Sequence, residues 1–242
     1  MPQRMGDSSQ PMHKPRKIAL LLAVTAAMAG ALTMAFRGAA EGSVALFGWA
    51  IGPCVALAAL ALVRARREGT LRDWARPEWG DITRGVVGGA ALFASAFAFV
   101  KVVIPAGSPR EAWMARIYLQ IGDPAMLRAH IGLVAVGVVI AAAAEEIVWR
   151  GLVQDIVGEV FGPRAAWIGS AALYALAHTG TAVVMRDGVA GYNPMLVFAA
   201  LGAGLVWGAM RKTFDRLLPG IFAHALFDWA VVMMFRLWGP SI

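Results

Sequence analysis

The chain has 242 residues, of which 59% are hydrophobic and 15% are charged, and its formal net charge is +7. A soluble domain usually carries about 45–50% apolar and about 25% charged residues, so this composition excludes a disordered chain and disfavours an ordinary soluble enzyme. The Lys and Arg residues lie between apolar runs and form no dense basic face, which argues against nucleic acid as a partner. The composition indicates a polytopic membrane protein that has the lipid bilayer as a partner.

Seven apolar runs follow one another along the chain, and each is long enough to cross a bilayer as a helix. A transmembrane helix needs about 20 mostly apolar residues, whereas barrel strands alternate in polarity over about 10 residues. Because the runs do not alternate, we expect an all-α bundle of about seven transmembrane helices. The expected runs are 18–36, 43–63, 85–106, 131–149, 165–185, 194–210 and 217–238.

The first run follows the basic residues Lys14, Arg16 and Lys17, as the apolar region of a signal peptide would. The run is longer than the usual h-region of about 7–15 residues, which favours an uncleaved signal anchor. With the N-terminus inside, 15 of the 22 Lys and Arg residues, Arg150 among them, fall on the inner side. Because positive charges accumulate in cytoplasmic loops, we expect a cytoplasmic N-terminus and a multi-pass protein of the inner (plasma) membrane.

Glycine spacing predicts where the membrane helices pack closely. Glycines four residues apart let two helix backbones approach each other, and three such pairs lie in the apolar runs. The pairs are Gly48 with Gly52, Gly85 with Gly89, and Gly204 with Gly208. The single cysteine, Cys54, excludes internal disulfides and any multi-cysteine metal site.

Charged residues inside membrane spans are costly and therefore mark candidate functional sites. The fourth run ends with Glu145, Glu146 and Arg150. Glu146 and Arg150 are four residues apart and share a helix face, so they can pair, whereas Glu145 is turned about 100° away. One carboxylate is then neutralised and the other is left to act as a general base toward water. The alternative is that the three residues are only the polar end of a helix.

Two later runs carry histidines at membrane depth. The fifth run contains Tyr174 and His178, and the seventh contains His224 and Asp228, again four residues apart. A lone membrane histidine is commonly a structural hydrogen-bonding group. Several ionisable groups on separate spans are, however, hard to leave unpaired in lipid. We therefore expect them to converge on one polar cavity between the fourth, fifth and seventh helices.

Together these segments resemble the CPBP intramembrane protease family, also called Abi, which includes the type II CAAX prenyl endopeptidases. The family pattern is EExxxR, then FxxxH, then HxxxN or HxxxD, each on its own membrane helix. The pattern is matched in order by Glu145, Glu146 and Arg150, by Tyr174 and His178, and by His224 and Asp228. Tyr174 stands where the family has Phe. The charge pattern and the apolar runs predict a cytoplasmic tail over 1–17 and N-terminal membrane helices and interfacial loops over 18–130. The resemblance implies a CPBP-like catalytic membrane core over 131–238.

The resemblance implies hydrolysis of a peptide bond within or beside the membrane. Glu145 would activate the attacking water, His178 would help to hold or polarise it, and His224 with Asp228 would stabilise the oxyanion. Glu146 and Arg150 would be the structural pair that supports Glu145, with Tyr174 as further support of the site. Because an ionised Asp cannot donate a hydrogen bond, Asp228 is either protonated or orients His224, and we favour orientation.

No cofactor is expected, and a zinc site is the alternative. Zinc would take Glu145, His178 and His224 as ligands. Glu146 would then have to serve as the base and would lose its link to Arg150. The HExxH pattern of zincins is absent from the sequence. We therefore expect a metal-free, glutamic-type protease.

Two non-proteolytic functions are the rivals: a membrane scaffold or immunity-type protein, and a proton-coupled transporter. The intact Glu145, His178 and His224 argue against a scaffold, and the absence of an internal repeat argues against an inverted-repeat transporter. The expected partner is a membrane-embedded or membrane-associated peptide or protein substrate. The Ala-, Gly- and Arg-rich composition is typical of bacterial chains, which favours a membrane peptide over a prenylated substrate.

Overall fold

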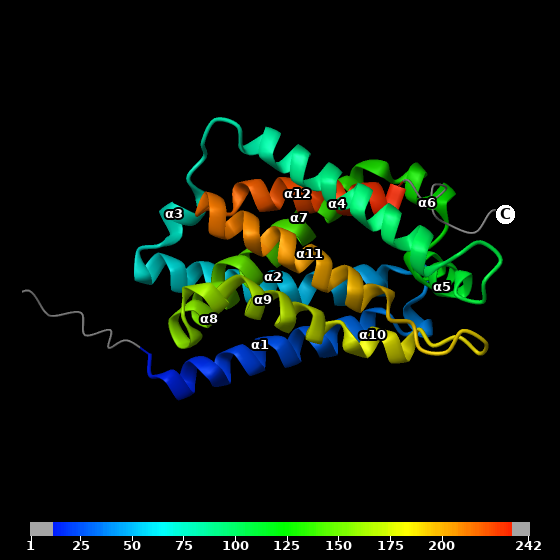
Figure 1. Ribbon diagram of the computed structural model, residues 1–242, viewed down its shortest axis with the longest axis horizontal. Coiled ribbons are helices and arrows are strands. Elements are labelled where there is room, and N and C mark those ends of the chain that lie inside the picture. Colours follow the sequence, from blue (N-terminus) through cyan, green and yellow to red (C-terminus); the bar gives the residue numbers. More distant parts are fainter. Residues whose placement is uncertain (1–11, 234–242) are drawn as a thin grey trace, which may run out of the picture.

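The computed structural model describes residues 12–233, and nearly all of them are helical (Figure 1). The elements are α1 (Lys14–Ala35), η1 (Gly38–Ala40), α2 (Val44–Glu68), α3 (Leu71–Ala75), α4 (Asp81–Val103), α5 (Glu111–Ile121), α6 (Pro124–Ala129), α7 (Ile131–Glu146), η2 (Ile147–Val153), α8 (Gln154–Phe161), α9 (Pro163–Ala177), α10 (Thr179–Val184), α11 (Met195–Phe214) and α12 (Leu218–Met233). Of these, η1 is a 3₁₀ helix and η2 a π-helix. Since no strand occurs within residues 12–233, the predicted all-α class is confirmed there.

Within residues 12–233, five helical segments are long and apolar enough to cross a membrane, which makes the chain a multi-pass membrane protein. They are α1, α2, α4, the continuous α7–η2–α8 segment and α11. The predicted count of seven is not reached by this criterion. The two remaining runs correspond to α9 with α10 and to α12, and α9 and α12 have 15 and 16 residues. Residues 1–11 of the predicted tail and 234–238 of the last run lie outside the described residues, and Lys14 already belongs to α1.

The fourth predicted helix is longer than the sequence indicated. It runs without a break over 31 residues, from Ile131 to Phe161, and stops at Gly162, whose φ of +94° breaks the helical backbone. Glu145 consequently lies near the middle of the segment instead of near its inner end. Arg150 is inside the helix and only 1% exposed, so its assignment to an inner loop was wrong.

The π-helix begins directly after Glu146 and was not predicted. The carbonyl oxygen of Trp149 accepts hydrogen bonds from the backbone N–H of Gln154 and from the Ser170 hydroxyl, the latter at 2.8 Å. An inserted π-turn widens the helix locally and is frequently found at functional sites. Here it separates the glutamate pair on α7 from the amphipathic helix α8.

Two of the three predicted glycine pairs are at close helix contacts. A Cβ on Gly85 would overlap Phe222, and one on Gly89 would lie 3.0 Å from the carbonyl oxygen of Ala223, so α4 packs tightly on α12. Gly204 and Gly208 have the same role between α11 and α9, where added Cβ atoms would meet Ala171 and Trp167. The third prediction was wrong, because Cβ atoms on Gly48 and Gly52 would have nothing within 4 Å.

The bundle has two distinct ends, and α1 and α4 lie along opposite edges of it (Figure 1). The start of α1 lies near α3 and α8 at one end, while α5, α6 and α10 lie at the other. An ion pair of 2.7 Å between Lys17 on α1 and Glu159 on α8 links two elements of the first end. The largest fully buried side chains include Trp149, Trp207 and Arg150, so the centre of the bundle contains a charge.

Candidate active site

Glu145, at the penultimate position of α7, accepts a hydrogen bond from a residue of another helix. The Tyr174 hydroxyl on α9 donates to its Oε2 at 2.6 Å. Tyr174 is 5% exposed, whereas Glu145 is only partly buried. Among the described residues, Glu145 therefore has a neutral hydroxyl as its partner and no cation within hydrogen-bonding distance, which leaves lone pairs able to accept from water.

His178 lies at the junction of α9 and α10, where it caps both helices. Its Nδ1 is 2.8 Å from the carbonyl oxygen of Tyr174, and its ring packs edge-on against the Tyr174 ring at 4.7 Å. Because a carbonyl oxygen only accepts, Nδ1 carries the proton, and Nε2 of the neutral ring is left as an acceptor. In the described chain His178 makes no hydrogen bond to Glu145, and Tyr174 lies between them as the shared neighbour.

Glu146 has a different environment from Glu145, as the helix geometry predicted. Its Oε1 lies 3.1 Å from Nη1 of Arg150 and 3.0 Å from Nδ1 of His224 on α12. All three side chains are at most 2% exposed. The predicted Glu146–Arg150 pair is therefore present, and it includes His224 as a third member.

His224 has a carboxylate near each ring nitrogen. Glu146 faces Nδ1, and Oδ2 of Asp228 lies 3.3 Å from Nε2. Both carboxylates can accept a hydrogen bond from the His224 ring only if both ring nitrogens carry protons. The Asp228 contact is longer than the roughly 2.7–2.9 Å of a tight charge-assisted hydrogen bond. The Asp228 side chain is 32% exposed, so this side of the ring is more open than the Glu146 side.

Sequence reasoning missed two residues that shape this site. The Trp207 ring on α11 stacks on His224, with ring centroids 3.6 Å apart and an angle of 18° between the rings. A Cβ on Gly220 would lie 2.8 Å from Oε2 of Glu146. The spacing of four between Gly220 and His224 could have placed Gly220 on the same helix face. No sequence signal identifies Trp207, because its contact depends on how α11 packs against α12.

Arg150 is held between two aromatic rings. Its guanidinium carbon lies 4.9 Å from the centre of the Tyr174 ring and 5.1 Å from that of the Trp207 ring. None of its side-chain nitrogens makes a hydrogen bond within the described chain. Its positive charge is thus balanced by Glu146 and by the electron-rich ring faces.

The residues of the zinc alternative are not assembled as a metal site. Within residues 12–233, no three His, Cys, Asp or Glu side chains converge closely enough to hold a metal ion. Both ring nitrogens of His224 face carboxylates, and Nδ1 of His178 faces a carbonyl oxygen. Of the predicted ligand atoms, the Glu145 carboxylate and Nε2 of His178 are left open, whereas both ring nitrogens of His224 are taken by carboxylates, so this arrangement does not fit a three-ligand zinc site.

The two adjacent carboxylates, Glu145 and Glu146, have different partners. Glu145 is partly exposed and hydrogen-bonded to one hydroxyl, whereas Glu146 is buried between the guanidinium of Arg150 and the ring of His224. Glu145 can therefore accept a proton from water, whereas the carboxylate of Glu146 is engaged by Arg150 and His224. Side chains from α7, η2, α9, α11 and α12 all contribute to the cluster.

Comparison with known proteins identifies the part of the chain that carries this cluster. The family model described as "Type II CAAX prenyl endopeptidase Rce1-like" matches residues 127–230, which include every residue of the candidate site. Neither the comparison with curated proteins nor the comparison with solved structures gave a match. The match over residues 127–230 supports membership of this chain in the CPBP family, to which the type II CAAX prenyl endopeptidases belong.

Proposed function

We propose that the chain is an intramembrane endopeptidase in which Glu145 activates the attacking water. The observation that carries the proposal is the convergence of α9 and α12 on the glutamate pair of α7, through Tyr174 at 2.6 Å from Glu145 and His224 at 3.0 Å from Glu146. Family membership supports a protease-type activity in the membrane. The choice of Glu145 as base rests on its free lone pairs and its partial exposure.

The proposed reaction is hydrolysis of a peptide bond of a membrane-associated protein or peptide. Water loses a proton to Glu145 as its oxygen attacks the carbonyl carbon, and the carbonyl oxygen becomes an oxyanion. The carbon–nitrogen bond then breaks, and the proton held by Glu145 passes to the leaving amine. General acid–base help of this kind typically contributes about 10²–10⁴-fold to a rate.

His178 and His224 have separate places in this scheme. Nε2 of His178 is free to accept from the attacking water, because the Tyr174 carbonyl holds the proton on Nδ1. His224 can donate from Nε2 to the oxyanion when a substrate displaces the loose 3.3 Å contact with Asp228. Until a substrate binds, Asp228 orients the His224 ring through this contact, which is the role favoured from the sequence. Glu146 supports the same ring from the other nitrogen.

We also propose that no metal takes part, and that the protein lies in the inner (plasma) membrane with its N-terminus in the cytoplasm. The orientation rests on the excess of Lys and Arg at the end of the bundle where α1 begins. A substrate would reach Glu145 near the middle of the fourth helix, so cleavage is expected at membrane depth.

The experiment that tests the function compares protein termini in membranes from cells with the wild-type gene, with Glu145→Gln and with no gene. Glu159→Gln is the matched control, because it makes the same chemical change at a partly exposed surface residue. We expect new termini with wild type and Glu159→Gln only, and the peptides name the substrate. Equal termini with wild type and Glu145→Gln, both different from the empty strain, would support the scaffold alternative and overturn the proposal.

A further inference from the structure

The connection between α2 and α4 contacts both the π-helix–α8 segment and the residue before α12, although it lies outside residues 127–230. Trp74 on α3 is 5% exposed, and its ring carbons would lie 2.8–3.1 Å from a Cβ on Gly151 of the π-helix. Its Nε1 donates to Asp155 on α8 at 3.2 Å. Its carbonyl oxygen accepts from the backbone N–H of Leu217, directly before α12, at 3.0 Å. Trp74 thus joins the helix of Glu146 to the start of the helix of His224.

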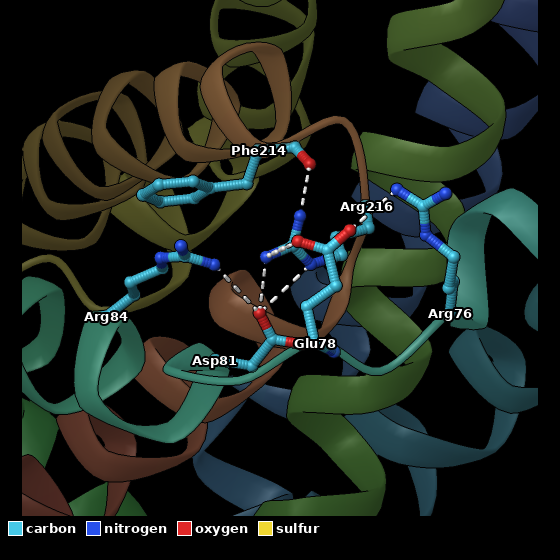
Figure 2. A network of polar contacts seen from close by, with 6 residues as sticks. All are labelled: Arg76, Glu78, Asp81, Arg84, Phe214 and Arg216. Carbon is cyan, nitrogen blue, oxygen red and sulfur yellow. Dashed lines mark hydrogen bonds and ion pairs between the residues drawn. The ribbon is translucent and has the colours of Figure 1, made fainter.

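A buried ion pair fastens the same connection to α12 a second time. Asp81, the first residue of α4, accepts from Nε and Nη2 of Arg216 at 2.9 and 2.7 Å, and both side chains are 5% exposed (Figure 2). Nη1 of Arg216 donates to the carbonyl oxygen of Phe214 at 2.8 Å, which fixes the turn between α11 and α12. Glu78 adds a contact of 3.0 Å to Nη2 of Arg216.

Arg216 lies a short distance before the residues of α12 that contact Glu146. Arg216 is two residues before α12, and Gly220 on its first turn approaches Oε2 of Glu146. The next turn carries His224, which contacts the other carboxylate oxygen of Glu146. Gly85 and Gly89 of α4 lie against the same stretch of α12, so the two helix backbones are in close contact there. In this register of α4 on α12, Nδ1 of His224 lies 3.0 Å from Oε1 of Glu146.

We propose that Asp81 and Arg216 are positioning residues of the proposed active site, acting as a latch that holds α12 in the register where His224 meets Glu146. The proposal rests on the proposed function for its catalytic consequence. Its structural part, the dependence of the α4–α12 register on the latch, stands without it. The latch connects α4, which precedes the family-matched region, to Arg216 within that region. The proposed active site therefore depends on both parts of the chain.

The latch differs from the other ion pairs in its neighbourhood. Arg76 and Glu78 pair at 2.6 Å, but their side chains are 63% and 39% exposed, and exposed pairs of this kind contribute little to stability. Asp215, next to Arg216, pairs with Arg211 at 2.6 Å while 91% exposed. Removing one partner of a buried pair is the larger perturbation: among the described residues, Arg216 would keep only Glu78 as an ion-pair partner, at 3.0 Å, and Asp81 would keep only Arg84, at 3.4 Å. Asp215→Asn is therefore the matched control for Asp81→Asn.

The first readout measures register and needs no substrate. In a Cys54→Ala background, cysteines at positions 89 and 226 report on the α4–α12 contact, because a Cβ on Gly89 would lie 3.4 Å from that of Leu226. This is close to the roughly 3.5–4.5 Å of a disulfide. Cysteines at 158 and 166 are the control pair, since the corresponding distance between Gly158 and Ala166 is also 3.4 Å. The measurement is the rate of disulfide formation in membranes under a membrane-permeant oxidant.

We expect Asp81→Asn and Arg216→Met each to slow cross-linking of the 89–226 pair at least threefold and to leave the 158–166 pair unchanged. Asp215→Asn should alter neither pair. Arg216→Lys keeps the charge but loses the forked donors, so it should give an intermediate rate; it also replaces Arg216→Met if that variant does not accumulate in membranes. Unchanged 89–226 rates in the latch variants would overturn the proposal.

The second readout separates positioning from folding. On a peptide that spans a Glu145-dependent cleavage site, the latch variants should lower kcat about 10–100-fold while KM stays within twofold, because a displacement of about 1 Å from the productive geometry is enough for such a loss. Asp215→Asn should keep the wild-type kcat, and Arg216→Lys should recover part of it. If Glu145→Gln still cleaves, the proposed function fails whatever the latch variants do. If Glu145→Gln is inactive while Asp81→Asn and Arg216→Met keep the wild-type kcat, the positioning proposal alone fails.

Discussion

Oε1 of Glu146 lies 3.0 Å from Nδ1 of His224, although the two residues are 78 positions apart in the sequence. The same oxygen faces Nη1 of Arg150 at 3.1 Å, so one buried carboxylate atom joins α7, the π-helix and α12. This makes Glu146 the structural centre of the cluster, whereas Glu145 is the residue left for chemistry. Adjacent glutamates in one sequence motif thus acquire different tasks from different neighbours.

Removing the Glu146 charge should destabilise the fold strongly. Glu146→Gln leaves the guanidinium of Arg150 buried without its counter-ion, which for a buried pair is worth about 3–5 kcal/mol. The double variant Glu146→Gln/Arg150→Met should be less destabilised than the sum of the single variants, since it removes both charges. Unfolding in detergent, followed by denaturant titration, measures the cycle.

The control for this cycle is Arg76→Ala, which breaks the exposed pair with Glu78. It should change the free energy of unfolding by about 1 kcal/mol or less. Additive effects of Glu146→Gln and Arg150→Met would contradict the direct coupling of the two side chains.

Gly220→Ala should damage the site by one added methyl group. A Cβ there would lie 2.8 Å from Oε2 of Glu146, closer than real Cβ contacts, so the carboxylate must shift from its position beside Arg150 and His224. Overpacking of this kind typically destabilises by about 1–3 kcal/mol. We expect at least a tenfold loss of the Glu145-dependent cleavage rate.

Gly202→Ala on α11 is the matched control for Gly220→Ala, because its Cβ would have nothing within 4 Å. Its cleavage rate and unfolding free energy should equal those of the wild type. A Gly220→Ala protein with wild-type cleavage would show that the position of Glu146 does not matter for the reaction.

The sequence reveals the polar residues of the site for a simple physical reason. Glu145, His178 and Asp228 stand out because ionisable groups are rare in apolar runs, and the spacing of four in Glu146–Arg150 and His224–Asp228 places each pair on one helix face. The Glu146–Arg150 contact follows from that spacing and is present in the structure. Local periodicity is enough to predict contacts within one helix.

Most contacts between helices could not be predicted from the sequence. The stacking of Trp207 on His224 and the pairing of Asp81 with Arg216 join segments whose relative placement depends on the packing of the whole bundle. The failed prediction for Gly48 and Gly52 has the same origin, since a glycine pair permits close packing without requiring it. The π-helix was missed because the apolar pattern of the fourth run does not distinguish it from an α-helix.

Tyr174→Phe tests whether the hydroxyl that donates to Glu145 is part of the chemistry. The change removes the 2.6 Å hydrogen bond but keeps the ring that packs on Arg150 and His178, and it restores the residue of the family pattern. We expect Glu145-dependent cleavage to persist within about tenfold of wild type, the equivalent of about 1.4 kcal/mol in the activation free energy. Glu145→Gln should be inactive.

Tyr192→Phe provides the control for that change, because the Tyr192 side chain is 60% exposed in the connection before α11. It should leave cleavage unaffected. If Tyr174→Phe were as inactive as Glu145→Gln, the Tyr174 hydroxyl would have to take part in proton transfer itself.

Chelation tests the proposed metal-free mechanism. Both ring nitrogens of His224 face carboxylates, so recruiting His224 to zinc would require breaking its contact with Glu146 or with Asp228. We expect the purified protein to keep its cleavage rate after prolonged treatment with EDTA and 1,10-phenanthroline, and added Zn²⁺ to give no increase. A rate that falls with chelator and returns with Zn²⁺ would instead support a zinc site at Glu145, His178 and His224. In that case His178→Ala should lower the zinc content of the protein, whereas His130→Ala, which changes an exposed histidine before α7, should not.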